Sequence, residues 1–307
     1  ERITINENAK ILWDNYPIGW LSPSDDIFKP NVQVLNSDLL NQDQIHLITQ
    51  RIKLFVDKKI VKNLSQLIDI KEEDFDNSSR GIIYSLKEGL GTTTIKNIFK
   101  AYKEISDNDK KEFSKVGLRF GVRYLYMPDL LKPESVKLRA LLWGIMNNTY
   151  YNAALPDDGR VAYTPDETAP NDWYNIIGYS KLGDRVMRVD MVERLLALIR
   201  VAAREGTFKI TEEMLSIAGA SKEQMSKVFQ DLGFENTDKD KKNEITFETL
   251  FKKKQKKITF KKKQKSNNKK NNLENKSKSN NKIHNKHNEK IDKNSPFFVL
   301  SNLKLKN

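Results

Sequence analysis

Apolar and polar residues alternate in short runs over residues 1–37. The apolar runs cover residues 3–5, 11–13 and 18–21, and segments rich in Asn, Asp and Pro separate them. Alternation with a period of two places every second side chain on the same face of a strand. The pattern therefore predicts a small β-meander over residues 1–37.

The period changes to that of a helix after Ser37. Apolar residues recur every three or four positions from Ile45 to Val56, which predicts a long amphipathic helix. Shorter helical patterns follow around residues 62–70, 77–89, 93–105 and 107–116.

Residues 118–126 interrupt the helical patterns with alternating residues that suit one strand or extended segment. Pro133 then fits the first turn of a helix, and the residues up to 146 are apolar enough for that helix to be buried. We expect a helical accessory domain with short β elements over residues 38–150.

The next segment has little periodicity and contains Pro156, Pro165 and Pro170, so we expect a loop or junction over residues 151–172. A small α-rich module is predicted over residues 173–236. It comprises extended pieces at 174–180 and 184–189, a helix over 191–204 and two short helices that end at Gly219 and Gly233.

Lys and Asn dominate residues 237–293, and almost no large apolar residue follows Phe260. Such a composition does not bury enough apolar surface to offset chain entropy, which predicts a disordered basic tail and no core beyond about residue 237. Apolar residues return in a short terminal motif over 294–307. The predicted fold class is α+β, predominantly helical.

The net charge of +13 is concentrated in the tail. Residues 251–307 hold 19 Lys and three acidic residues, whereas residues 1–250 hold 35 basic and 38 acidic residues. A cationic arm attracts polyanions through salt-dependent release of counterions. Lys and Asn enrichment is also what an A/T-rich coding sequence produces, so the role of the arm stays open.

Several classes of protein are excluded by composition. The chain has no Cys, so it has no disulfide, thiolate zinc site, iron–sulfur cluster or cysteine nucleophile. No run approaches the roughly 18 apolar residues of a membrane span, and no secretory signal follows Glu1, so we expect a cytoplasmic protein without a membrane partner. The sequence contains no phosphate loop, acidic metal box or His-Asp-Ser set, and we assign no catalytic residue, metal ligand or cofactor within the chain.

Two basic sets are candidates for nucleic-acid binding. The first surrounds Tyr124, Tyr126 and Trp143 and consists of Arg119, Arg123, Lys132, Lys137 and Arg139. The second flanks the helix over 191–204 and consists of Lys181, Arg185, Arg188, Arg194, Arg200 and Arg204. Guanidinium groups contact phosphates and aromatic rings stack on bases. The alternative is that the rings are core and the cations line a solvated or internally paired face.

Three blocks of sequence resemble, in order and spacing, the region after the motor domains in bacterial homologues of the mitochondrial degradosome helicase. The first covers residues 116–133 (VGLRFGVRYLYMPDLLKP) and 138–143 (LRALLW), the second 177–179 and 185–195 (RVMRVDMVERL), and the third 215–221 with 232–234. The likeness spans about residues 1–235. Ser295, Pro296 and Phe297, with Leu300 and Leu303, are similar to the terminal motif of that family, which follows a basic low-complexity spacer.

This resemblance implies a superfamily 2, DExH-type helicase whose ATP- and Mg-binding motor domains lie upstream of Glu1, and we expect this chain to be the later part of such a protein. It implies single-stranded RNA or DNA as a partner and the motor domains in cis, with a degradosome-type protein as a further candidate partner. The expected nucleic-acid contacts are Arg119, Arg123, Tyr124, Lys132, Lys137, Arg139, Arg185 and Arg188. The rival interpretation is a non-enzymatic adaptor that binds nucleic acid through its basic tail.

Overall fold

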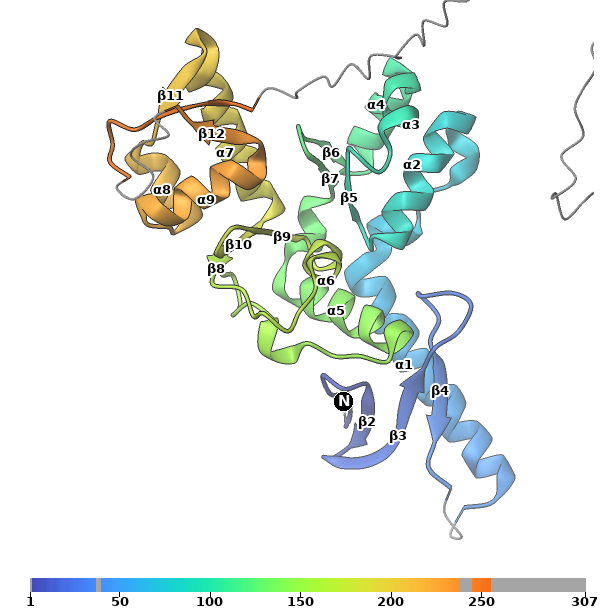
Figure 1. Ribbon diagram of the computed structural model, residues 1–307. Coiled ribbons are helices and arrows are strands. Elements are labelled where there is room, and N and C mark those ends of the chain that lie inside the picture. Colours follow the sequence, from blue (N-terminus) through green and yellow to red (C-terminus); the bar gives the residue numbers. More distant parts are fainter. Residues whose placement is uncertain (1, 37–39, 238–244, 255–307) are drawn as a thin grey trace, which may run out of the picture. The chain divides into compact units, whose positions relative to one another are not determined.

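The structure, a computed structural model, describes residues 2–36, 40–237 and 245–254. In those residues the chain is α+β with a helical majority, as predicted (Figure 1). The strands form four small sheets, in which every pair of neighbouring strands is antiparallel.

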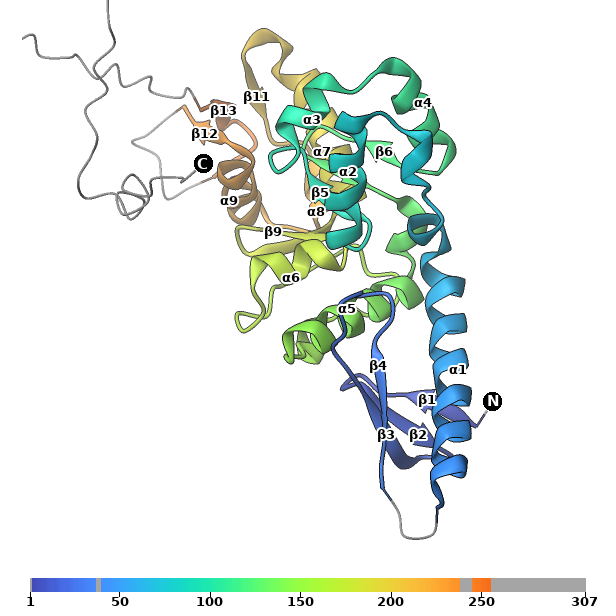
Figure 2. The same cartoon turned by 90° about the vertical axis from the view of Figure 1, so that its right-hand side faces the viewer.

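The predicted meander over the first residues is confirmed. Strands β1 (Ile3–Ile5), β2 (Lys10–Trp13), β3 (Tyr16–Ser22) and β4 (Asn31–Val34) pair in sequence order. Helix α1 (Gln42–Ile68) begins at a capping box formed by Asn41 and Gln44, and Figure 2 shows the meander beside its first half. The pattern at 62–70 proves to be the continuation of α1, because Leu64 and Leu67 stay on its buried face.

The middle of the chain departs from prediction at two places. After the short helix η1 (Glu72–Asp74) and α2 (Asn77–Glu88), residues predicted as helical form β5 (Thr92–Thr94) before α3 (Phe99–Glu104) and α4 (Asp107–Lys115). The single extended segment expected at 118–126 is a hairpin of β6 (Arg119–Phe120) and β7 (Tyr124–Tyr126). β7 pairs with β5 on one edge and with β6 on the other. The pairing of β5 with β7 brings Thr92 opposite Tyr126, a separation along the chain that local periodicity does not encode. The hairpin itself is local, with Arg119 opposite Tyr126.

Helix α5 (Pro133–Asn147) follows the short helix η2 (Pro128–Leu131) and is buried on nearly all sides, as its composition predicts. The predicted junction contains the short helix η3 (Asn152–Ala154) and β8 (Ala162–Tyr163), which pairs with β10 (Arg185–Arg188).

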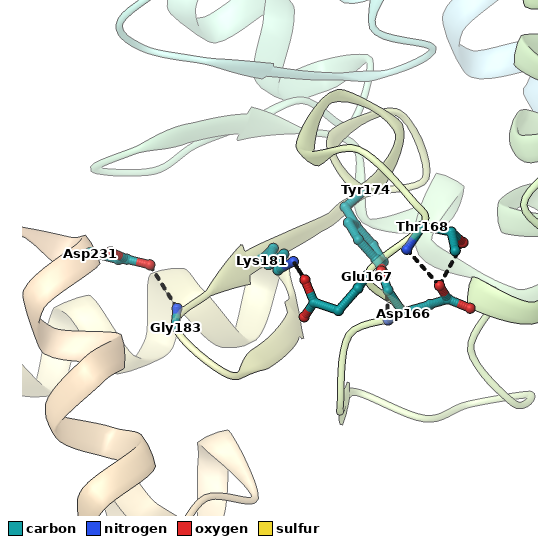
Figure 3. A network of polar contacts seen from close by, with 7 residues as sticks. All are labelled: Asp166, Glu167, Thr168, Tyr174, Lys181, Gly183 and Asp231. Atoms are coloured by element: carbon teal, nitrogen blue, oxygen red, sulfur yellow. Dashed lines mark hydrogen bonds and ion pairs between the residues drawn. The ribbon is translucent and has the colours of Figure 1, made fainter.

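The extended piece predicted at 174–180 is wrong over its first half, which belongs to α6 (Asn171–Ile176) and precedes β9 (Tyr179–Leu182). Trp173, Tyr174 and Ile177 share a buried face at helical spacing. The Tyr174 hydroxyl also receives a hydrogen bond from the amide of Asp166 at 2.9 Å (Figure 3). This bond ties the junction to α6.

The last part contains α7 (Val189–Ala202), the short helix η4 (Ala203–Glu205), β11 (Thr207–Lys209), α8 (Glu212–Ala218), α9 (Lys222–Leu232) and β12 (Phe234–Asn236). The expectation that no core exists beyond residue 237 is wrong, because β13 (Leu250–Lys253) lies between β11 and β12. Phe251 is buried against Phe208 and Phe229. The rest of the predicted tail and the terminal motif lie outside the described residues.

Three apolar clusters hold the described residues together. The first joins the meander, α1, α2, α4 and α5, the second joins α7 to α9 with β11 and β13, and the third surrounds Trp173. The second cluster also takes Tyr124 and Leu131 from the predicted accessory domain. The described residues belong to one compact unit as a result.

Candidate nucleic-acid interface

The turn of the β6–β7 hairpin is fixed to helix α7 by one carboxylate. Glu193 of α7 accepts hydrogen bonds from the backbone amides of Val122 at 2.5 Å, Arg123 at 2.8 Å and Tyr124 at 2.8 Å. Successive amides that converge in this way form an anion-binding concavity. A Cβ at Gly121 would lie 2.3 Å from the Glu193 carboxylate carbon, so only glycine leaves room for this approach. We call these contacts the Glu193 joint.

Two of the predicted contact residues also belong to this region, and both are held by the protein itself. Tyr124 is 2% exposed, and its hydroxyl shares a 2.7 Å hydrogen bond with Ser180. Its ring is therefore core and does not reach a base for stacking. The Arg123 guanidinium donates to the backbone oxygen of Asp231 at 3.1 Å and lies over the Tyr124 ring at 5.9 Å.

The end of α9 is a second anchor for this region. The Asp231 carboxylate, on the same residue that Arg123 contacts, accepts a hydrogen bond from the amide of Gly183 at 2.7 Å. Figure 3 shows this bond at the turn between β9 and β10, and beside it the ion pair of Lys181 with Glu167 at 3.1 Å. Lys181 thus has a carboxylate partner.

Arg139 is fully buried and is not accessible to a strand of nucleic acid. Its guanidinium donates to the backbone oxygen of Leu130 at 3.0 Å and to the Thr92 hydroxyl at 2.7 Å. Among the described residues no carboxylate pairs with it, and its Nε atom has no hydrogen-bond partner. Burial lowers the pKa of Arg139 to about 9, so the group is still charged at neutral pH. The contacts assign Arg139 a structural role.

Three further candidates have their charge offset by an aspartate. The pairs are Lys132 with Asp129 at 2.6 Å, Lys137 with Asp158 at 2.8 Å, and Arg188 with Asp190 at 2.7 Å. The Asp158 hydrogen bond raises the pKa of Lys137, and the Asp190 hydrogen bond raises the pKa of Arg188. These three residues therefore fit the alternative interpretation, in which the cations line an internally paired face.

Arg119 differs from the other members of the first set. It is exposed on β6, opposite Tyr126 in the strand register. No ion pair or hydrogen bond joins its guanidinium to any residue that the structure describes. Burial, followed by the charges of Asp190 and Glu193, raises the pKa of Tyr126, whereas the charge of Arg119 opposes that shift. Arg119 is therefore a free cation next to a half-buried ring.

Arg185 occupies a separate position on β10. Its guanidinium donates to the backbone oxygen of Ala218 at 3.3 Å, at the end of α8, and to the Thr164 hydroxyl at 3.4 Å. It lines a cavity of about 370 Å³ together with Arg160, which pairs with Asp157. Burial and then the charge of Arg160 lower the pKa of Arg185. The structure thus separates Arg185 from Arg119 and places them on different sheets.

The remaining members of the second set divide in the same way. Arg194 pairs with Glu213 at 3.3 Å, whereas Arg200 and Arg204 are exposed and make no ion pair within the described ranges. Glu193 and Gly121, which organise the site, were not predicted to be site residues. An isolated acid on a helix gives no signal for a partner 71 positions away.

No group of three or more metal-ligating side chains occurs in the described part of the chain. Within the same residues, no helix combines the length and the apolar composition needed to cross a bilayer. Comparison of the chain with protein-family models, with curated proteins and with solved structures finds no match.

Proposed function

We propose that this chain is the nucleic-acid-engaging region of an ATP-dependent superfamily 2 helicase, with the ATP- and Mg-binding motor domains in cis. The observation that carries the proposal is the Glu193 joint. It links residues 122–124 of the first family-like block to Glu193 of the second. Two segments that resemble the family separately are thus in direct contact.

The joint also supports a mechanical role. A hairpin whose turn is held by three amide hydrogen bonds presents Arg119 at a fixed position on its outer strand. An exposed cation that is not offset by a carboxylate contributes to phosphate binding, whereas a paired one contributes less. We assign the strand contact of this sheet to Arg119 and not to Arg139, Lys132 or Lys137.

Reversing the charge of Arg119 tests the contact. In a chain that lacks residues 255–293, we expect Arg119→Glu to weaken binding of fluorescein-labelled single-stranded RNA or DNA about tenfold, as measured by fluorescence anisotropy. The matched control is Lys132→Glu, since Lys132 is also exposed but already pairs with Asp129. Equal effects of the two variants would contradict the assignment.

The adaptor remains the second candidate, because 19 Lys stand against three acidic residues in residues 251–307. Deleting residues 255–293 separates the two functions. An adaptor loses nearly all affinity for nucleic acid, whereas a strand-contacting body retains a salt-dependent remainder. The deletion starts at 255 because β13 ends at Lys253, and the amide of Lys254 donates to Gly233.

The motor domains are tested independently of binding. We expect the sequence encoded upstream of Glu1 to contain, in frame, a phosphate loop and an acidic box within about 450 residues, the span of two ordinary domains and their linkers. An initiator Met directly before Glu1 would contradict the helicase proposal and favour the adaptor.

A further inference from the structure

A cleft between the meander and α1 brings together cations and aromatic rings that lie far apart in the sequence. Arg2 and Trp13 line it from the meander, and Arg51, Phe55 and Lys58 line it from α1. The cleft has a volume of about 250 Å³. None of these residues belongs to the hairpin or to the Glu193 joint.

The local structure explains why these side chains converge. Arg51, Phe55 and Lys58 are spaced by four and then three positions, which places them on one face of α1. Trp13 ends β2 opposite Ile3 in the strand register, and Figure 2 shows the meander next to that part of the helix. Trp13 is 39% exposed, so one part of its ring stays open to a ligand.

Two of the three cations that line the cleft have no carboxylate partner among the described residues. Between Arg51 and Lys62, α1 carries five Lys and Arg residues and one acid, Asp57. The side chains of Arg51 and Lys58 make no ion pair or hydrogen bond with another described residue. Arg2 is the third cation, and it pairs with Asp14 at 3.7 Å.

We infer that this cleft binds single-stranded nucleic acid, with a base stacked on Trp13 and the backbone phosphates next to Arg51 and Lys58. Guanidinium and ammonium groups interleaved with exposed aromatic rings are the features that bind single strands irrespective of sequence. The inference takes its ligand class from the proposed function. It places a second contact on α1, at a distance in the sequence from Arg119.

A neighbouring apolar cavity suits a different class of ligand from the cationic cleft. It has a volume of about 660 Å³, shares Ile3, Trp13 and Arg51 with the cleft, and is otherwise lined almost entirely by apolar side chains such as Val34 and Leu47. An apolar molecule or a protein segment fits that cavity better. The cationic side of Trp13 suits an anionic polymer with flat bases.

Photo-crosslinking of the full chain locates the contact. A single-stranded RNA that contains 4-thiouridine is irradiated with the protein, and the adducts are mapped by mass spectrometry of peptides. We expect adducts within residues 10–13 and 52–58 in addition to any in the tail. Adducts confined to the tail and the hairpin would overturn the inference and leave the cleft to a protein or an apolar ligand.

Affinity measurements on the chain without residues 255–293 test the charges. We expect Lys58→Glu to weaken binding of the same RNA about tenfold and Lys53→Glu less than twofold. Lys53 is the matched control, because it is an exposed lysine of the same helix that does not line the cleft. We expect Trp13→Leu to weaken binding at least fivefold through loss of stacking.

The two proposals fail in different ways. If Arg119→Glu weakens binding and Lys58→Glu has no more effect than Lys53→Glu, the inference is wrong and the proposed function stands. If the truncated chain binds no strand at all, the proposed function is wrong. Lys58 is exposed, so its substitution leaves the core intact and decides the question even if Trp13→Leu alters folding.

Discussion

The planar guanidinium group of Arg139 connects segments that are far apart in the sequence. Its guanidinium reaches Leu130 just before α5 and Thr92 on β5, and a Cβ at Gly178 would lie 3.0 Å from one of its nitrogens. The folded state keeps this charge out of water, which lowers its pKa to about 9. Because that pKa is below the value of the free side chain, the buried charge opposes folding at neutral pH, and this cost falls only as the pH rises above about 9.

We expect Arg139→Lys to lower the free energy of unfolding by about 2–4 kcal/mol, measured by urea denaturation. One ammonium group does not reproduce the planar fork that serves both Leu130 and Thr92, and a buried acceptor would lose its donor. Lys137→Ala is the control, since Lys137 is exposed on the same helix and its pair with Asp158 contributes at most about 1 kcal/mol. A loss no larger than that of the control would disprove the structural role of Arg139.

The Glu193 joint predicts that the stability effects of substituting Glu193 and Gly121 are coupled. We expect Glu193→Gln and Gly121→Ala each to cost about 2 kcal/mol of stability, because the first removes the charge that the amides bind and the second displaces the carboxylate. In a double-mutant cycle their effects overlap by about 1 kcal/mol or more, since both break the same contacts. Glu213→Gln, at an exposed pair with Arg194, serves as the control. Strictly additive losses would show that the two residues act independently.

Among the elements, β13 shows that one buried side chain can hold a strand in a Lys-rich segment of the chain. Its sequence Leu250-Phe251-Lys252-Lys253 resembles the Lys-rich residues that follow, yet Phe251 is fully buried. The ring packs 5.0 Å from Phe229 and 5.9 Å from Phe208. The lysines of the strand stay exposed, so the strand needs only one apolar position to complete the core.

We expect Phe251→Ala to cost about 3–5 kcal/mol, because it leaves a cavity between β11 and α9. Phe247→Ala is a matched control from the same segment. Phe247 is 37% exposed and contacts mainly the Lys222 ammonium, a contact that contributes about 0.5–1 kcal/mol. Thermal unfolding of both variants measures the difference, and similar melting temperatures would contradict the position of β13.

Periodicity predicts the elements whose apolar face is local, such as the meander, α2, α5 and the pair α8 and α9. It fails where the partner is distant in sequence, as for the strands β5 and β13 and for Glu193, which holds the turn of the β6–β7 hairpin. The same limit applies to the candidate site, since local sequence shows residue type but not distant partners. Residue type identified the cations, but only the fold distinguishes free Arg119 from buried Arg139. The apolar residues on every side of Arg139 in α5 were a usable signal of its burial.

For the whole molecule, the proposed binding of nucleic acid would draw on two separate sources of positive charge. Residues 1–250 are nearly neutral, so we expect their attraction for a polyanion to depend on a few cations that lack partners among the described residues. In the same proposal the tail contributes many cations, because residues 255–293 contain 14 Lys and three acidic residues. Counterion release makes the salt dependence of binding a measure of how many cations of each kind contact phosphates.

The salt dependence of single-strand affinity therefore separates body from tail. Each phosphate contact to a single strand contributes about −0.7 to the slope of the logarithm of the association constant against the logarithm of the salt concentration. With three contacts, at Arg119, Arg51 and Lys58, the chain without residues 255–293 is expected to show a slope of about −2. The full chain should have a slope at least twice as steep. Arg119→Glu and Lys58→Glu should each make the slope of the truncated chain shallower by about 0.7, whereas Lys53→Glu and Lys132→Glu should leave it unchanged. A truncated chain with a slope near zero would mean that the tail supplies all the phosphate contacts, as the adaptor requires.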